Sequence, residues 1–223
     1  MSERTNELGQ PIGFAVPDWT ARPRPPRTAI EGRYCRIEPL DPARHAEDLH
    51  TANSADPAGG MWTYMGYGPF ADLAAYRAWL GRSCLGDDPL FHAVVEAESG
   101  RALGVASYLR IEPAVGVLEV GHIAYAPALQ RSRAATEAQY LLMRRAFAEL
   151  GYRRYEWKCD ALNAPSRRAA DRLGFTFEGV FRQATLYKGR NRDTAWFSII
   201  DADWPALDAA YRRWLSPDNF DAA

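Results

Sequence analysis

The sequence predicts one α/β domain of the α+β kind, in which helices flank a mixed, mostly antiparallel central sheet of about seven strands. Two observations lead to this prediction. Three consecutive apolar runs between residues 91 and 125 are joined by short turns, as in an antiparallel meander. After them, strand-like and helical segments alternate, so helices can cover the sheet. A chain of 223 residues, 47% of them apolar, can bury one substantial core.

The predicted elements follow from local patterns along the chain. Residues 1–28 hold five prolines and few aliphatic side chains, which predicts an extended arm ahead of a single domain at 29–223. The elements expected in that domain are a strand at 33–40, helices at 42–52 and 72–82, strands at 91–96, 102–111 and 115–125, a helix at 134–150, a strand at 155–159, a helix at 164–173, strands at 176–186 and 193–200, and a helix at 204–215.

Caps and breakers set the boundaries of these elements. Asp41 followed by Pro42 is typical of a helix start. Glycine and proline interrupt residues 53–69, and helical spacing returns after Asp72. Gly151 and Gly174 each follow a helical segment and predict its end.

Composition excludes several classes of protein. The net charge is −1 with both signs dispersed, which argues against a nucleic-acid or membrane-surface partner. The three cysteines are far apart and lack C-x-x-C spacing, so neither a disulfide framework nor a metal site is expected. Without a long apolar run or an apolar signal core, the expected location is the reducing cytoplasm.

The most informative segment joins the third strand of the meander to the following helix. The strand stops at Pro127, a short basic loop follows, and the helix opens with small residues. Backbone N–H groups at such a helix start have no intrahelical partner and attract anions. The loop from Gln130 to Thr136 therefore predicts a phosphate or pyrophosphate site.

This segment resembles the coenzyme-binding motif of the GNAT superfamily of acyl-CoA-dependent N-acetyltransferases, written Q/R-x-x-G-x-G/A. Gln130, Arg133 and Ala135 fall on its three fixed positions. Arg133 replaces the central glycine, so its side chain must turn away for the backbone to adopt the same geometry. The order of elements from Gly32 to about Asp201 is similar to the whole GNAT fold.

A second segment, Cys159 to Ser166 followed by Leu173-Gly174-Phe175, resembles the RimJ/RimL-like branch, which contains the ribosomal-protein N-terminal acetyltransferases. There an N-x-x-S helix start contacts coenzyme A, and the alternative is that Asn163 or Ser166 is only a helix cap. The resemblance implies acetyl-CoA as cofactor and no metal. The implied coenzyme-binding residues are Ile123, Ala124, Tyr125, Gln130, Arg131, Ser132, Arg133, Ala134, Ala135, Thr136, Asn163, Ser166 and Arg167.

Glu119 is the predicted catalytic base. A carboxylate within a sheet must face a cleft, pair with a cation, or have its pKa raised by desolvation, and a glutamate on this strand often serves as base in GNAT relatives. An ion-paired glutamate without catalytic role is the alternative. Ser166 and Tyr187 are candidates for the general acid. His122 lies three residues after Glu119, so the two share a face only if a bulge intervenes. The alternative for His122 is a core histidine that is hydrogen-bonded to the backbone.

Two further segments are expected to wall the acceptor site. The aromatic loop after the first helix supplies Trp62, Tyr64, Met65 and Tyr67, which with His122 form the predicted substrate-binding set, or else a hydrophobic plug. The last hairpin carries several arginines and a lysine, which would favour an acceptor with a carboxylate or phosphate, or are solvated turn charges.

The resemblance implies an acetyl-CoA-dependent N-acetyltransferase in which a primary amine attacks the thioester directly within a ternary complex. The acceptor is a protein N-terminus or a small-molecule amine. The phosphate loop and the N-x-x-S start contain no cysteine, which disfavours an acyl-cysteine intermediate. A non-catalytic acyl-CoA-binding or interaction protein is the alternative. The proline-rich arm and terminal helix could form a homodimer or pack on their own chain.

Overall fold

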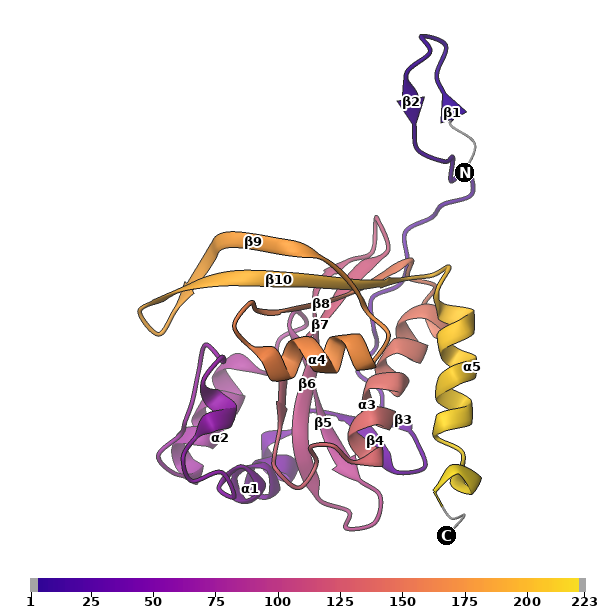
Figure 1. The fold of residues 1–223 in the computed structure, drawn as a ribbon. Helices are drawn as coiled ribbons and strands as arrows, with labels where there is room; N and C mark the ends of the chain where they lie inside the picture. The colour runs from indigo at the N-terminus through magenta and orange to yellow at the C-terminus, as the bar shows by residue number, and fades with distance from the viewer. Residues whose placement is uncertain (1–3, 221–223) are drawn as a thin grey trace.

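The computed structural model describes residues 4–220 and places eight strands in one sheet with helices on both faces (Figure 1). The order across the sheet is β3-β4-β5-β6-β7-β8-β10-β9. Its strands are β3 (Ile30–Glu31), β4 (Cys35–Pro39), β5 (Leu90–Glu96), β6 (Ala102–Glu112), β7 (Val117–Tyr125), β8 (Arg154–Asp160), β9 (Thr176–Tyr187) and β10 (Arg190–Ile200). The helices are α1 (Pro42–Asn53), α2 (Leu73–Ser83), α3 (Arg133–Arg144), α4 (Ala164–Arg172) and α5 (Trp204–Trp214). The predicted fold class and element order are confirmed, with β3 as an additional short strand.

The two faces of the sheet have different covers. Along β5, Leu90 and Val94 join the core under α3 and α5, whereas Phe91 and Val95 join the core under α1 and α2. This alternation is what a strand buried on both faces requires. Beyond the helices α1 and α2, the same face continues over β7, β8 and β10 with charged and polar side chains, and there the candidate site lies.

The sequence predicts an extended N-terminal arm, but part of this arm forms a hairpin in the structure. Residues 4–12 form a hairpin of β1 (Arg4–Thr5) and β2 (Pro11–Ile12) that projects from the body (Figure 1). Its turn is closed by the Asn6 carboxamide, which accepts hydrogen bonds from the amides of Leu8 and Gln10. Further along, the Trp19 indole donates to the carbonyl of Ala114, which ties the arm to the β6–β7 turn.

The C-terminal helix packs on its own chain. Trp204 and Tyr211 are buried, and both rings lie against Tyr140 of α3. No helix among residues 4–220 combines the length and apolar character needed to cross a membrane.

Strands β7 and β8 pair in parallel, whereas the other neighbouring strands of this sheet are antiparallel. Their pairing runs from Val117 with Arg154 to Val120 with Trp157 and then stops. On the other side of β7 the register with β6 shifts between Gly121 and Ala124, and His122 adopts a φ of 50°. The bulge turns the end of β7 away from β8, and the two strands separate towards their carboxyl ends.

Candidate active site

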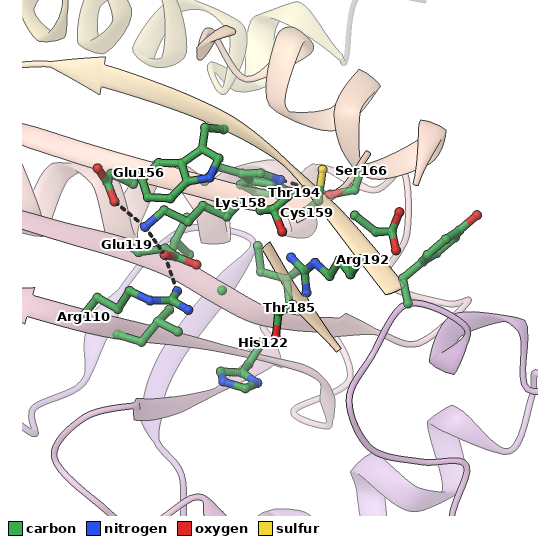
Figure 2. A pocket seen from close by; sticks show the side chains of 18 of the residues that line it. Arg110, Glu119, His122, Glu156, Lys158, Cys159, Ser166, Thr185, Arg192 and Thr194 are labelled. Carbon is green, nitrogen blue, oxygen red and sulfur yellow. Dashed lines mark hydrogen bonds and ion pairs between the residues drawn. The ribbon is translucent and has the colours of Figure 1, made fainter. Parts of the chain in front are cut away.

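A cavity of about 750 Å³ lies where β7 and β8 separate (Figure 2). Strands β6 to β10, the α1–α2 loop and the start of α4 line it. It collects predicted coenzyme, catalytic and acceptor residues from distant parts of the sequence. These are Tyr64, Met65, Tyr67, Glu119, His122, Ile123, Asn163 and Ser166.

Glu119 and His122 line the same cavity because a bulge in β7 lies between them. Without such a bulge, the alternation of side chains along the strand would place them on opposite faces. Nδ1 of His122 lies 3.3 Å from the hydroxyl of Tyr67, and its ring stacks on that phenol. Burial, with the charges of Arg110 and Arg192, lowers the pKa of His122 to about 4. The imidazole is therefore neutral at physiological pH, held by a side chain rather than by backbone.

Glu119 faces the cleft and is also paired with cations, two of the three situations foreseen for it. Its Oε2 accepts from Arg110 at 2.6 Å and from the Lys158 ammonium at 2.9 Å. Its Oε1 has no hydrogen-bond partner among residues 4–220 and lies on the side of Gly121. One oxygen is thus fixed by charge, and the other is available to an acceptor or to water.

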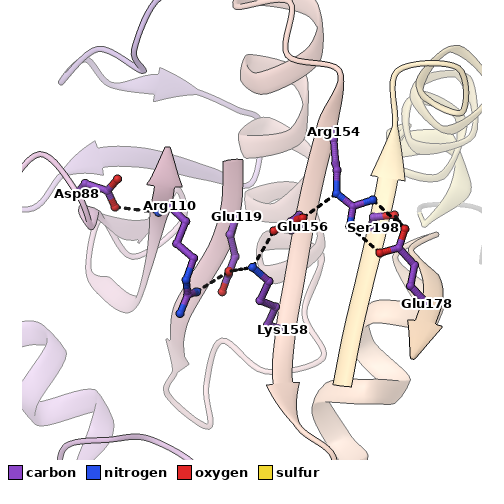
Figure 3. Close-up of polar contacts among 8 residues, drawn as sticks. All are labelled: Asp88, Arg110, Glu119, Arg154, Glu156, Lys158, Glu178 and Ser198. Atoms are coloured by element: carbon purple, nitrogen blue, oxygen red, sulfur yellow. Dashed lines mark hydrogen bonds and ion pairs between the residues drawn. The ribbon is translucent and has the colours of Figure 1, made fainter. Parts of the chain in front are cut away.

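Glu119 is part of a row of alternating charges that crosses the sheet (Figure 3). Lys158 also holds Glu156 at 2.8 Å, and Arg154 joins Glu156 to Glu178. We call the six side chains the charge row: Arg110, Glu119, Lys158, Glu156, Arg154 and Glu178. Glu119 and Glu156 are direct neighbours in the parallel register, and the shared lysine compensates their repulsion.

The loop at Gln130–Thr136, which the sequence predicts to bind a phosphate or pyrophosphate, has the unpaired amides expected of an anion site. The amides of Arg131, Arg133 and Ala134 have no hydrogen-bond partner in the part of the chain that the structure describes. Ser132 caps α3 by accepting from the amide of Ala135. This loop lies outside the residues that line the cavity.

Arg133, at the position of the motif's glycine, turns away as expected. Its guanidinium lies over the rings of Tyr34 and Phe220, at 5.4 and 4.5 Å from their centres. The left-handed residue of this loop is Arg131, with a φ of 59°. Glycine at position 133 is thus not needed for a positive φ, because Arg133 is the first helical residue.

Asn163 and Ser166 have a structural role and also line the cavity. The Asn163 carboxamide caps α4 by accepting from the amide of Ser166. The Ser166 hydroxyl accepts from the indole of Trp157 at 3.0 Å, a hydrogen bond that does not use the hydroxyl's own proton. The helix start thus presents two polar groups at the opening between the strands.

The structure does not bring every predicted residue to the cavity wall. Trp62 is buried in the core under α2, where its carbonyl accepts from Lys188, so the plug foreseen for the aromatic loop is present beside the cavity-lining Tyr64, Met65 and Tyr67. Tyr187 donates instead to Asp160 at 2.8 Å, and Arg167 turns to the carbonyl of Ala161. Two predicted coenzyme-binding residues of β7, Ala124 and Tyr125, also lie outside the cavity lining. Both pair with β6, and the Tyr125 hydroxyl accepts from Gln139.

Several cavity residues were not foreseen by the sequence analysis. Glu156, Lys158 and Asp160 occupy alternate positions of β8, so their period of two placed all three on one face of the sheet. Arg110 and Trp196 line the cavity as well. The alternation of charged residues along this strand could have been recognised in the sequence. The residues with which they form ion pairs could not, because these lie on strands whose order in the sheet was unknown.

A cysteine does lie at the candidate site, because Cys159 lines the cavity although the phosphate loop and the N-x-x-S start contain none. Its thiol is buried, and burial raises its pKa. A protonated thiol is a weak nucleophile. Among residues 4–220, no group of three or more histidine, cysteine, aspartate or glutamate side chains is placed to hold a metal ion.

Comparison with known proteins accounts for this architecture. A family model described as an acetyltransferase (GNAT) domain matches residues 35–176. The chain belongs to the GNAT acetyltransferase family. It is therefore an N-acetyltransferase by family, and the family uses acetyl-CoA.

Solved and curated relatives agree. A GCN5-related N-acetyltransferase from Brucella melitensis is 50% identical, covers 93% of this chain and 94% of its own, and superposes with a TM-score of 0.90. A probable acetyltransferase of the GNAT family from Chromobacterium violaceum is 41% identical, over 88% of this chain and 98% of its own, with a TM-score of 0.81. The curated N-acetyltransferase p20 of Bacillus licheniformis, itself uncharacterized, is 28% identical over 63% of this chain and 80% of its own length.

Proposed function

We propose that this GNAT protein transfers the acetyl group of acetyl-CoA to a primary amine by direct attack within a ternary complex, and that it belongs to the RimJ/RimL-like branch. The observation that carries the proposal is the cavity at the separation of β7 and β8, which joins Glu119 and His122 to the start of α4. The motif from Asn163 to Ser166 with Leu173-Gly174-Phe175 supports the branch. Three free, buried cysteines suit a cytoplasmic protein.

The chain offers a suitable holder for the coenzyme. The free amides of Arg131, Arg133 and Ala134 stand at the positive end of α3, beside the small side chains of Ala134 and Ala135. These groups would hold the pyrophosphate, and Asn163 would contact the pantetheine arm. Bound acetyl-CoA supplies the activated acyl group.

The protein's own residues would then manage protons. Oε1 of Glu119 is free to accept a proton from the ammonium of the acceptor, directly or through water, while Arg110 and Lys158 fix the carboxylate through Oε2. Attack of the amine breaks the thioester bond and releases the coenzyme A thiolate, and for the general acid that would protonate this thiolate we propose Ser166, since it lines the cavity and its own proton is not used in the bond with Trp157. Tyr187 is less suited, because it donates to Asp160 and its burial raises its pKa to about 12.

The test is release of free thiol from acetyl-CoA across a panel of amino acids, polyamines, aminoglycosides and short peptides. We expect turnover with at least one amine, and Glu119→Gln should lower kcat/KM about 10²- to 10⁴-fold without changing acetyl-CoA affinity. Glu156→Gln is the matched control, because it removes the same charge from the same lysine but leaves Glu119 in place. Full turnover by Glu119→Gln at neutral pH would remove it from the mechanism.

Direct attack has its own test in Cys159, the cysteine that lines the cavity. Cys159→Ala should retain turnover within about a factor of three, since a buried, protonated thiol carries no acyl group in a ternary mechanism. Mass spectrometry of the enzyme with acetyl-CoA alone provides the second measurement. An acetylated enzyme that disappears on adding amine, together with an inactive Cys159→Ala variant, would contradict direct attack.

A further inference from the structure

The β10 wall of the cavity carries hydrogen-bond donors that have no acceptors. Arg192, Thr194 and Trp196 stand at alternate positions of β10 and line the cavity. Nε of Arg192 and Nε1 of Trp196 are buried without a hydrogen-bond partner among residues 4–220. Buried donors are nearly always satisfied in folded proteins, so two of them on residues that line one cavity indicate a ligand that supplies acceptors.

Arg192 also differs from the other cations of the cavity in having no counterion. Arg110 and Lys158 are both bound to Glu119. The guanidinium of Arg192 forms no ion pair or hydrogen bond with any residue that the structure describes. Figure 2 shows its side chain reaching into the cavity beside Thr185, its partner in the β9–β10 register.

The carboxylates of the cavity are engaged elsewhere. Glu119 and Glu156 share Lys158. Asp160, opposite Thr194 in the register, accepts from the Tyr187 hydroxyl and the Leu162 amide. Glu112 lies at the other end, where it pairs with Val117 at the start of β7. Among residues 4–220 no carboxylate forms an ion pair with Arg192, so an anionic ligand is the counterion expected for it.

The position of Arg192 suits an acceptor rather than the coenzyme. The row Arg192, Thr194, Trp196 lies on the same face as Glu119, opposite the α3 face. After burial and Arg110, the charge of Arg192 also lowers the pKa of His122, so the guanidinium lies near the strand that carries both His122 and Glu119, the proposed base for the amine. At this end the aromatic loop is fastened by Tyr64 to the carbonyl of Leu162 and by Lys188 to that of Trp62.

We propose that Arg192, assisted by the Trp196 indole and the hydroxyls of Thr185 and Thr194, binds the oxyanion of an acceptor that carries both a primary amine and a carboxylate or phosphate. A guanidinium presents paired donors that match either group. The inference rests on the proposed function, because it names the substrate class of the same site. It makes Arg192 a specificity-determining residue for the acceptor.

The test compares acceptors that differ only in the oxyanion. Free amino acids are paired with their carboxamides, and aminoalkyl phosphates with the corresponding amino alcohols, so the two arms separate carboxylate from phosphate. The wild-type protein should prefer the members that carry an oxyanion. Arg192→Gln should lower their kcat/KM about 10- to 100-fold, mainly through KM, and leave the uncharged members unchanged. Arg192→Lys should fall between, since it keeps the charge but loses the paired donors.

Arg190→Gln is the matched control, because Arg190 is an exposed arginine of the same strand that does not line the cavity. It should behave as wild type. A readout independent of turnover is the pKa of His122, followed by NMR without acetyl-CoA. An amino acid or aminoalkyl phosphate bound at Arg192 should raise that pKa, and its uncharged partner should not.

The outcomes separate this inference from the proposed function. If no amine supports thiol release, the proposed function fails. If wild type turns over charged and uncharged partners equally and Arg192→Gln changes neither, the inference is overturned and the function stands. A loss of acetyl-CoA affinity in Arg192→Gln, measured by calorimetry, would also overturn it, because Arg192 would then belong to the coenzyme site.

Discussion

The charge row and the β10 wall lie on the same face of the same sheet, yet they treat polar groups in opposite ways. In the charge row each of the six side chains has at least one oppositely charged partner, from Arg110 to Glu178. In the β10 wall Nε of Arg192 and Nε1 of Trp196 have no hydrogen-bond partner among residues 4–220, although the Lys158 ammonium lies over the Trp196 ring. Paired charges hold one another and orient Glu119, whereas unpaired donors are free to select a ligand.

Burial strengthens this contrast. Lys158 exposes only 7% of its side chain and is bonded to two nearly buried carboxylates. A buried ion pair adds little net stability, but removing one partner is strongly unfavourable. Substitution in the charge row should therefore lower stability most at its most buried members. Substitution of Arg192, whose guanidinium has no partner among residues 4–220, should be tolerated in the free protein.

The largest effect is expected at Lys158. Lys158→Met leaves Glu119 and Glu156 side by side without their shared cation, so we expect a loss of about 3–5 kcal/mol in the free energy of unfolding. Urea unfolding followed by circular dichroism measures it. The double variant Lys158→Met with Glu156→Gln removes the repulsion and should recover part of the loss. Equal stability of single and double variants would mean that the two carboxylates do not interact.

The same contrast explains what the sequence could predict. The order of elements, the cap at Asp41 and the loop at Gln130–Thr136 arise from neighbours in sequence, and the structure has them where patterns placed them. The partners of Glu119 could not be read, because Arg110 and Lys158 reach it only once β6, β7 and β8 lie side by side. The positions of Trp62 and Tyr187 could not be read for the same reason: a core contact holds Trp62, and a hydrogen bond to Asp160 holds Tyr187, outside the residues that line the cavity.

A smaller, pH-dependent effect is expected at the outer end of the charge row. Arg154 lowers the pKa of Glu178 below its usual 4.5, so this pair stabilises the fold above about pH 4.5 and the contribution is lost as the pH falls through the folded-state pKa. Because Glu178 is 37% exposed, screening limits the effect. Glu178→Gln should cost about 0.5–1 kcal/mol at pH 7. The gap from wild type in urea unfolding should close towards pH 3, and a gap independent of pH would contradict this assignment.

The smallest effect on stability is expected at Arg192, and it comes with a distinct signature. Arg192→Gln should change the free energy of unfolding by less than about 0.5 kcal/mol, since no partner is lost. It should raise the pKa of His122 by removing one nearby positive charge, although burial, the largest cause, keeps that pKa below 6.5.

The pH dependence of stability should report the same change. His122 has a folded-state pKa of about 4, so the unfolded chain binds its proton first, and stability present above pH 6.5 is lost as the pH falls towards 4. Arg192→Gln should reduce that loss. Arg110→Gln provides the comparison: it removes a second charge that acts on His122 and should raise the same pKa, but it also breaks the 2.6 Å ion pair with Glu119. If both variants raised the pKa of His122 and both lowered stability equally, Arg192 would have a partner within the fold, and the two regions would not differ.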